Sequence, residues 1–326
     1  MFDVVVIGGA NTDYLVRGTR LPEAGETVQG DTFEAAEAGG KGVNQAVATA
    51  RLGMRVAFIG RVGADARGEA LRRRLMDEGV DVRHVAIDPR AATGVALINV
   101  DERGEKQILV APGANLHLSP SDVKKAAKVI REARVLVLQF EVPMKANLAA
   151  ARIAHGAGVP IVLDPAPAVR APKELLRLVS VIRPNEHEAE ALTGVKVHDR
   201  KSARKSAERL LAHGIRAAII AAGADGNLVV WRKGDQRGEE LWLPKMPVKT
   251  IDATGAGDAF AAGLAVALAE GHSVMEAALF ANAAAALATT RLGAQPALPK
   301  RGAVLSLLRR SGSKAEAKSF ARIESR

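Results

Sequence analysis

The residues best suited to chemistry lie at 252–264, which read Asp-Ala-Thr-Gly-Ala-Gly-Asp-Ala-Phe-Ala-Ala-Gly-Leu. Three small residues, at 255–257, precede the acid Asp258, and an almost wholly apolar segment follows as far as Ala269. This pattern predicts a buried helix with unhindered backbone N–H groups and a carboxylate at its N-terminus. Such N–H groups stabilise anions, and the carboxylate can take a proton from a hydroxyl. The stretch therefore fits phosphoryl transfer to a hydroxyl, although an Asp258 that only caps the helix stays open as an alternative.

A second glycine-rich segment also precedes a predicted helix. Gly39, Gly40, Lys41 and Gly42 lead into an apolar helical pattern that ends near Gly53. A glycine-rich loop that opens a helix is a geometry for holding phosphate or another ligand. It is not a Walker A loop, because glycine rather than serine or threonine follows the lysine.

The composition narrows the classes of function. The 326 residues carry a formal net charge of +10, with 48% hydrophobic and 25% charged residues, as in a globular protein. No apolar run reaches the roughly 18 residues of a membrane-spanning helix, and the N-terminus lacks the basic segment of a signal peptide. Cysteine is absent, which excludes disulfides and thiolate chemistry. We therefore expect a cytoplasmic protein with no membrane partner.

The positive charge alone is not a signal for nucleic acid. Lys and Arg are spread along the chain, and aromatic residues make up only 3%, so platforms for stacking bases are scarce. The excess charge fits a site for small anionic ligands, and we do not expect nucleic acid as a partner.

Apolar strand patterns alternate with helical patterns along most of the chain. Strands are predicted at 2–7, 56–60, 135–138, 160–163, 181–182 and 216–222, and helices at 43–52, 67–78, 143–156, 200–213, 258–269 and 274–288. Repeated strand–helix units predict an α/β fold with a doubly wound, mostly parallel sheet. Two β-like runs at 94–100 and 106–110 flank a turn outside this alternation, which indicates a hairpin outside the main sheet.

Polar or glycine-rich residues recur where the predicted strands end. They are Asn11, Asp13, Glu141, Asn185, Glu188 and the segment 223–226. Because ligands of open α/β sheets bind beyond the carboxyl ends of strands, we expect a shared cleft there. The alternatives are that Asn11 and Asp13 only form turns and that Glu141 is a solvated loop acid. We interpret Asp164 and Asp225 as turn formers.

Several of these stretches, in order and spacing, resemble the ribokinase-like carbohydrate kinases. They are Asn11-Thr12-Asp13, 25–28 (Gly-Glu-Thr-Val), 39–46 (Gly-Gly-Lys-Gly-Val-Asn-Gln-Ala), 184–188, 252–258 and 293–296. The resemblance runs from about residue 3 to 309. It implies an α/β/α kinase domain over 1–310 with a small β-sheet lid, formed by about 14–38 and 93–111, through which two subunits pair. Residues 311–326 are basic, and we expect them to be disordered and dispensable.

The resemblance also implies roles for individual residues. Asp258 is the expected base, and Gly255, Ala256 and Gly257 are expected to offer N–H groups to the transferred phosphoryl group. The residues expected around the sugar are Asn11, Asp13, Gly40, Lys41, Asn44, Glu141 and Asp258. Those expected around ATP and Mg²⁺ are Asn185, Glu188, Ala221, Gly223, Asp225, Gly226, Gly257 and Asn282. Those expected to hold K⁺ are Asp252, Thr254, Ala288, Arg291 and Gly293.

The reaction implied is transfer of the γ-phosphoryl group of ATP to the primary C5 hydroxyl of D-ribose. Fructose, 2-deoxyribose, a hexonate or a nucleoside remain alternative substrates, although the lid offers only Tyr14 and Phe33 as platforms for a base. A sugar-binding regulator without activity is the alternative of another class, and such a protein needs no base. Ala297 stands where the family often has a serine that binds K⁺, so we expect only weak activation by potassium.

Overall fold

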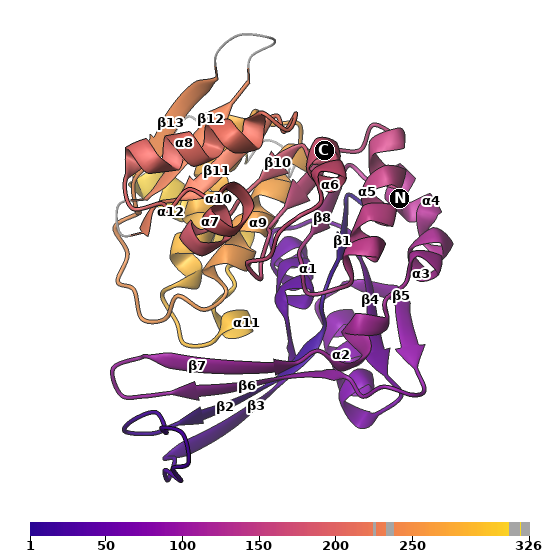
Figure 1. Ribbon diagram of the computed structural model, residues 1–326, viewed down its shortest axis with the longest axis vertical. Helices are drawn as coiled ribbons and strands as arrows, with labels where there is room; N and C mark the ends of the chain where they lie inside the picture. The colour runs from indigo at the N-terminus through magenta and orange to yellow at the C-terminus, as the bar shows by residue number, and fades with distance from the viewer. Residues whose placement is uncertain (224–225, 233–237, 313–319, 321–326) are drawn as a thin grey trace.

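The computed structural model describes residues 1–223, 226–232, 238–312 and 320 (Figure 1). The strands of its larger sheet are β1 Val4–Ile7, β4 Val56–Gly63, β5 Asp81–Asp88, β8 Val135–Leu138, β9 Ile161–Leu163, β10 Val181–Ile182, β11 Ala217–Ala221, β12 Asn227–Trp231 and β13 Glu239–Leu243. The strands of its smaller sheet are β2 Asn11–Arg17, β3 Thr32–Gly39, β6 Gly94–Val100 and β7 Lys106–Ala111. The helices are α1 Lys41–Arg51, α2 Ala66–Asp77, α3 Pro120–Lys125, α4 Ala127–Glu132, α5 Met144–Gly156, α6 Lys173–Leu178, α7 Glu186–Thr193, α8 Arg200–Leu211, α9 Ala256–Ala269, α10 Val274–Ala288, α11 Ala294–Ala297 and α12 Arg301–Arg310, with a 3₁₀ turn at Gly113–His117.

The larger sheet has the order β13-β12-β11-β10-β9-β8-β1-β4-β5 and is covered by helices on both faces (Figure 1). Successive side chains of a strand point to opposite faces. In β1, Val4 and Val6 accordingly enter one hydrophobic cluster, with α9 and α10, while Val5 and Ile7 enter the other, with α5 and α8. Pairing is parallel from β5 to β11, and only β12 and β13 run antiparallel. The predicted α/β fold with a doubly wound, mostly parallel sheet is confirmed.

The smaller sheet, which we call the lid, has the order β3-β2-β6-β7 and projects from the main body (Figure 1). The predicted hairpin is present as β6 and β7. Asn11 and Asp13 differ from the expectation of a loop, because they belong to β2. Their backbone groups pair with β3 on one side and β6 on the other, so a strand rather than a turn positions them.

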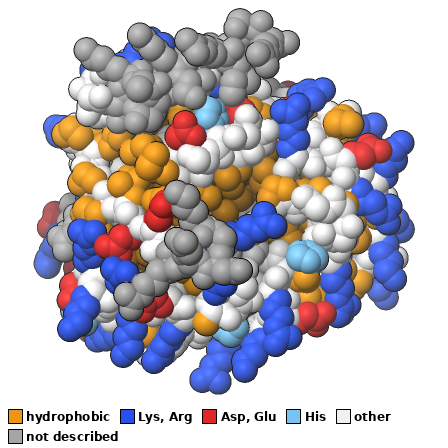
Figure 2. Space-filling view, turned by 90° about the horizontal axis from the view of Figure 1, so that it is seen from above, with side chains coloured by type: hydrophobic (Ala, Val, Ile, Leu, Met, Phe, Trp, Pro, Cys, Tyr) orange, Lys and Arg blue, Asp and Glu red, His pale blue; other side chains and the backbone are white. Residues whose placement is uncertain are grey.

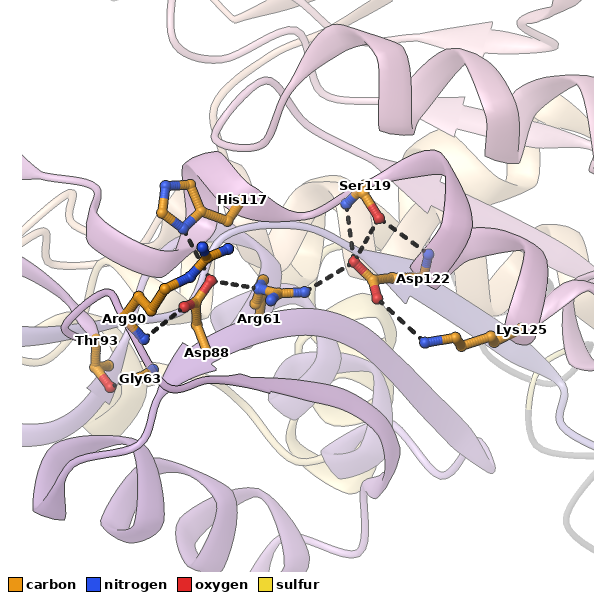
Figure 3. A network of polar contacts seen from close by, with 9 residues as sticks. All are labelled: Arg61, Gly63, Asp88, Arg90, Thr93, His117, Ser119, Asp122 and Lys125. Carbon is orange, nitrogen blue, oxygen red and sulfur yellow. Dashed lines mark hydrogen bonds and ion pairs between the residues drawn. The ribbon is translucent and has the colours of Figure 1, made fainter.

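Ion pairs and hydrogen bonds fix the segment from which the lid hairpin leaves the main body (Figure 3). Arg61 of β4 pairs with Asp88, at the end of β5, at 2.9 Å and with Asp122 of α3 at 3.0 Å. Thr93, directly before β6, accepts a hydrogen bond from the Gly63 N–H and donates one to Asp65, the N-cap of α2. Strand β6, the first strand of the lid hairpin, therefore starts from a fixed point.

The surface shows no single basic stripe on the face seen in Figure 2. Lys and Arg side chains are distributed around its border, with hydrophobic side chains between them. Within the described ranges, no helix combines the length and apolarity needed to span a bilayer.

The C-terminal segment contains a docking residue that the sequence analysis missed. Phe320 is fully buried, with its ring centroid 3.9 Å from that of His272 and 4.6 Å from that of Phe280. Its carbonyl accepts a hydrogen bond from Arg301 of α12. The expectation of a wholly disordered, dispensable tail is therefore wrong at this position. A lone aromatic residue in a polar segment gives no periodic signal by which to find it.

Replacing Phe320 by alanine should lower the thermal stability of the protein. Loss of a buried phenyl ring costs about 3 kcal/mol, which lowers the melting temperature of a chain of this size by roughly 4 °C. Thermal unfolding of Phe320→Ala, with Met76→Ala at a half-exposed position of α2 as control, measures this. Equal melting temperatures of the two variants would show that Phe320 does not dock.

Candidate active site

The candidate site is centred on Asp258 in the first turn of α9. Gly255 is the N-cap of this helix, with φ of 81°, a backbone conformation that favours glycine. The Asp258 side chain is buried, and its two oxygens accept hydrogen bonds from Asn44 and Gln45, each at 3.1 Å. Both amides belong to α1, so the two predicted glycine-initiated helices meet at this carboxylate.

Lys41 and Asp164 complete the immediate surroundings of Asp258. The Lys41 Nζ lies 3.9 Å from Oδ1 of Asp258 and 3.6 Å from Oδ2 of Asp164. Gln45 donates from the same Nε2 to Asp164, at 2.8 Å, and accepts at its Oε1 from Gln139, at 2.5 Å. Asp164 follows β9 and is almost completely buried, so our interpretation of it as a turn former was incomplete.

Close approach of the backbone explains the glycines around Lys41. A Cβ on Gly42 would lie 2.6 Å from the carbonyl carbon of Gly8, which follows β1. A Cβ on Gly9 would lie 2.4 Å from Oε2 of Glu141, and this same oxygen accepts the Lys41 N–H at 2.8 Å. Side chains at these glycines would push the start of α1 away from the ends of β1 and β8.

The predicted sugar-binding residues lie next to this centre. The Asp13 carboxylate lies against Gly39, where a Cβ would come within 2.2 Å of Oδ2. Asn11 is buried, and its Oδ1 accepts a hydrogen bond from Asn115 at 2.8 Å. Gly40, with φ of 85°, turns the chain from β3 into α1. The burial and side-chain hydrogen bond of Asn11 go beyond what a turn former needs.

A cavity of 490 Å³ lies between the lid and the main body, beginning at Asp13. It extends to the loop at 252–254 and to 292–296, and this volume is in the range of ligand sites. Its lining is Asp13, Leu15, Arg17, Glu34, Ala35, Ala38, Arg74, Ile98, Val100, Lys106, Asp252, Thr254, Leu292, Gly293, Ala294, Gln295 and Pro296. The cavity therefore connects the predicted sugar side with the predicted cation loop.

The buried carboxylates shift one another's protonation. Burial, and secondarily the charge of Asp258, raises the pKa of Asp13 to about 7. Burial raises the pKa of Glu141 to about 7 against the opposing effect of Lys41. Burial also raises the pKa of Asp258, which Lys41 again opposes. Burial disfavours the charge on Lys41, but the carboxylates around it outweigh this and raise its pKa.

Asn185 and Glu188 form a capping box at the N-terminus of α7. Asn185 Oδ1 accepts the Glu188 N–H, and the Glu188 carboxylate accepts from the N–H and side-chain amide of Asn185, all at 2.9 Å. Burial raises the pKa of Glu188, and the charge of Asp164 adds to this, so the pair is electrically linked to the Asp258 centre.

Arg183 is a cation near the start of α9 that the sequence analysis did not single out. A Cβ on Gly257 would lie 3.1 Å from its Nη1, and its guanidinium lies over the ring of Phe260, 5.0 Å from the centroid. The first N–H groups of an α-helix have no partner within the helix, so Gly257 also presents a donor here. The Ala256 N–H differs, because it donates to the Ala253 carbonyl at 3.2 Å.

The residues predicted along the nucleotide form a second group beside α10. Ala221 ends β11, Gly223 has φ of 59°, and a Cβ on Gly226 would lie 2.2 Å from the Leu243 carbonyl oxygen. Asn282 of α10 donates to the Pro244 carbonyl at 3.0 Å and accepts from Asn227 at 3.3 Å. Asp225 lies outside the described residues.

The residues predicted to hold potassium surround the loop before α9. Asp252 Oδ2 accepts the Gly293 N–H at 3.0 Å, and the Thr289 carbonyl accepts the N–H groups of Ile251 and Asp252. Ala288 is buried at the end of α10, and Arg291 is exposed. A lid residue that we did not predict, Lys106, donates to Asp252 and Thr254.

The residues missed in the sequence are Gln45, Asp164, Arg183 and Lys106. The sequence contained signals by which two of these residues, Asp164 and Gln45, could have been identified. Asp164 follows a predicted strand, where ligand residues of such sheets gather, and Gln45 lies one residue after the predicted Asn44. No local pattern identifies Arg183 or Lys106, because their partners are far away in the sequence.

Comparison with known proteins agrees with this geometry. Residues 1–301 match the model of the pfkB family carbohydrate kinases. Ribokinase of Haemophilus influenzae is 41% identical over 305 residues, covering 94% of this chain and 98% of that protein. The structure of Arabidopsis thaliana ribokinase complexed with ribose and ATP is 34% identical, with a TM-score of 0.86 over 94% of this chain and 99% of that one. Ribokinase of Thermotoga maritima is 32% identical, with a TM-score of 0.83 over 95% and 100% of the two chains. This chain belongs to the pfkB family of carbohydrate kinases.

Proposed function

We propose that the protein is an ATP-dependent kinase that phosphorylates the C5 hydroxyl of D-ribose, and that it acts in the cytoplasm, where ATP is available. The observation that carries this proposal is the buried Asp258 carboxylate at the N-terminus of α9, held by Asn44 and Gln45 beside the sugar-side residue Asp13. The relatives named ribokinase, and the Arabidopsis enzyme with bound ribose and ATP, support the choice of sugar and nucleotide.

In the proposed reaction Asp258 takes the proton of the C5 hydroxyl. The hydroxyl oxygen forms a bond to the γ-phosphorus as the bond from that phosphorus to the β–γ bridging oxygen breaks, which releases ADP. A raised pKa suits Asp258 to this role, because a carboxylate in ordinary solution is a weak base. Asn44 and Gln45 fix the direction in which its oxygens face.

The negative charge that develops on the transferred group requires donors at the start of α9. The Gly255 and Gly257 N–H groups are positioned as such donors. The positive end of the α9 dipole and the nearby cations Lys41 and Arg183 add further stabilisation of negative charge. Ala256 contributes less, because its N–H is engaged with Ala253.

Magnesium bound to the ATP phosphates would neutralise their charge when present. Among the described residues no cluster of three His, Cys, Asp or Glu side chains could hold a metal. This fits Mg²⁺, which takes few protein ligands because phosphates and water complete its shell. Asn185 and Glu188 would contact its water, since their side chains are already engaged with each other.

The lid cavity favours a bare sugar over a nucleoside. Its described lining contains no aromatic side chain on which a base could stack. Tyr14 and Phe33 instead stack on each other, with ring centroids 6.0 Å apart. A regulator without activity is disfavoured, because sugar binding alone does not need a base held at the start of a helix beside two cations. Fructose, 2-deoxyribose and adenosine are the competing substrates to assay against ribose.

We propose that two copies pair through the outer face of the lid. Strand pairing places Val16, Phe33, Leu97 and Leu109 on the face opposite to the cavity, and Phe33 and Leu109 are 64% and 71% exposed. A contiguous exposed apolar face on a four-stranded sheet is typical of an interaction surface. A second copy supplies an identical apolar face, so the surface is self-complementary.

Asp258→Asn should abolish turnover while preserving the fold. Asparagine keeps the shape of the side chain and cannot accept the hydroxyl proton, so turnover should fall by about 100-fold or more. Steady-state turnover, ribose binding by calorimetry and the melting temperature are measured on one preparation. Turnover within about threefold of wild type would contradict the base assignment. Lost turnover together with a lost melting transition would support the capping role instead.

Asp13→Asn should stabilise the ligand-free protein more at high pH than at low pH. The pKa of Asp13 rises from 3.8 to about 7 on folding, so the folded state favours the protonated form. Wild-type stability is therefore greatest below the unfolded value and is lost as pH rises towards 7. We expect the variant's gain in melting temperature to be larger at about pH 8 than at about pH 5, by at least about 2 °C. A pH-independent gain, or the same pattern in the exposed control Asp31→Asn, would contradict the assignment.

Leu109→Glu should convert the proposed dimer into a monomer. A charge on the apolar lid face cannot be solvated once that face is covered. Sedimentation at micromolar concentration compares it with wild type and with Leu116→Glu, which replaces an exposed leucine outside the lid strands. A wild-type protein that sediments as a monomer would refute the dimer.

A further inference from the structure

Lys106 connects the lid to the loop that leads into α9. It is the first residue of β7, and its Nζ donates to Asp252 Oδ1 at 2.5 Å and also to Thr254 Oγ1. Only 28% of its side chain is exposed, and that of Asp252 is 9% exposed. The contact joins two segments 146 residues apart, one on each side of the cavity.

The Asp252 carboxylate is already engaged on both oxygens. Besides Lys106, Oδ1 accepts the N–H of Thr254 at 2.9 Å and its hydroxyl at 2.6 Å, while Oδ2 accepts the Gly293 N–H at 3.0 Å. The charge of this carboxylate is thus balanced by an ammonium group of the same chain.

The side chains at this loop do not fit the potassium ion expected from the sequence. The one carboxylate of the predicted set pairs with Lys106, and Ala297 has no side-chain oxygen. Potassium binds through several oxygen ligands, whereas the side-chain oxygens of Asp252 and Thr254 already accept from the Lys106 ammonium group. An ammonium group carries the same charge as K⁺ and is of similar size.

The position of this charge matters for the proposed reaction. Thr254 is followed directly by Gly255, the N-cap of α9, and the 251–254 segment is held on its other side by Thr289 and Gly293. A charge that fixes Asp252 and Thr254 therefore fixes the backbone from which the Gly255 and Gly257 N–H groups project. Because Lys106 belongs to the lid, the loop has this charge only when the lid lies over the cavity.

We propose that Lys106 is a positioning residue that supplies, from the lid, the monovalent positive charge ordering the 252–257 loop, so that activity does not depend on potassium. This inference rests on the proposed kinase function. It couples closure of the lid over the sugar to assembly of the phosphate-binding N–H groups. An alternative, in which Lys106 only tethers the lid mechanically, predicts a different response to added potassium.

The test compares wild type with Lys106→Gln, which keeps much of the side-chain length and removes the charge. Arg103→Gln, at the exposed tip of the same hairpin, is the matched control for loss of a lid cation. Each protein is measured in potassium chloride and in tetramethylammonium chloride at equal ionic strength. The readouts are turnover with ribose and ATP, and the melting temperature without substrates.

Wild type and Arg103→Gln should each differ by less than about twofold in turnover between the two salts, which is smaller than the effect of one charged hydrogen bond. Lys106→Gln should lose about 10- to 100-fold in tetramethylammonium, the effect of removing such a bond, and recover most of it in potassium. Its melting temperature should rise in potassium relative to tetramethylammonium, because the small ion takes the place of the ammonium group. The wild-type melting temperature should be equal in the two salts.

Two results would overturn the inference. One is a wild-type protein whose turnover rises severalfold in potassium, or whose melting temperature rises by several degrees. The site would then bind the ion despite Lys106. The other is a Lys106→Gln variant whose loss potassium does not restore, which would leave Lys106 as a tether. If wild type phosphorylates no ribose in either salt, the proposed function fails, and the melting temperatures still decide the inference.

Discussion

A set of buried carboxylates arranged around one ammonium group is the interaction on which the site depends. Asp258 and Asp164 lie within 4 Å of the Lys41 ammonium group, and Glu141 accepts a hydrogen bond from the Lys41 backbone N–H. Burial of such charges is costly unless they are paired and hydrogen-bonded. The fold meets this requirement by bringing amide donors of α1 and the start of α9 to the carboxyl ends of β1, β8 and β9. The residual cost is expressed as raised pKa values at Asp13, Glu141 and Asp258. A carboxylate destabilised in this way is a stronger base, so the electrostatic cost and the proposed chemistry have one origin.

The helices position the residues around Asp258, and the lid encloses the cavity beside them. Gly42 and Gly263 permit close packing, the first of α1 against the end of β1 and the second of α9 against Ala281 of α10. The two helix N-termini are thereby held at fixed positions on the sheet. The lid closes the other side of the cavity and reaches the 252–254 loop through Lys106. In the proposed reaction, sugar enclosure and phosphate stabilisation would then be parts of one structural unit.

The sequence predicted the parallel core well and the long-range polar contacts poorly. Strands such as β1 and β8 are continuous apolar runs because both of their faces are buried, so their positions are evident. Strands β12 and β13 at the antiparallel edge were not predicted, because they lie outside the strand–helix alternation. Asp258 followed from a local pattern, and Asn44 followed from the resemblance to the family. Lys106 and Arg183 did not, because their roles arise only when segments distant in the sequence meet, and no pattern within a short window records that.

The most direct measurement of the central claim is a crystal structure of the protein with ribose and an ATP analogue that cannot transfer its γ-phosphoryl group. The account predicts that the C5 hydroxyl lies within hydrogen-bonding distance, about 3 Å, of an Asp258 carboxylate oxygen, with the γ-phosphorus facing the N–H groups at the start of α9. A ribose bound with its C5 hydroxyl directed away from Asp258, or a γ-phosphate held elsewhere, would contradict it.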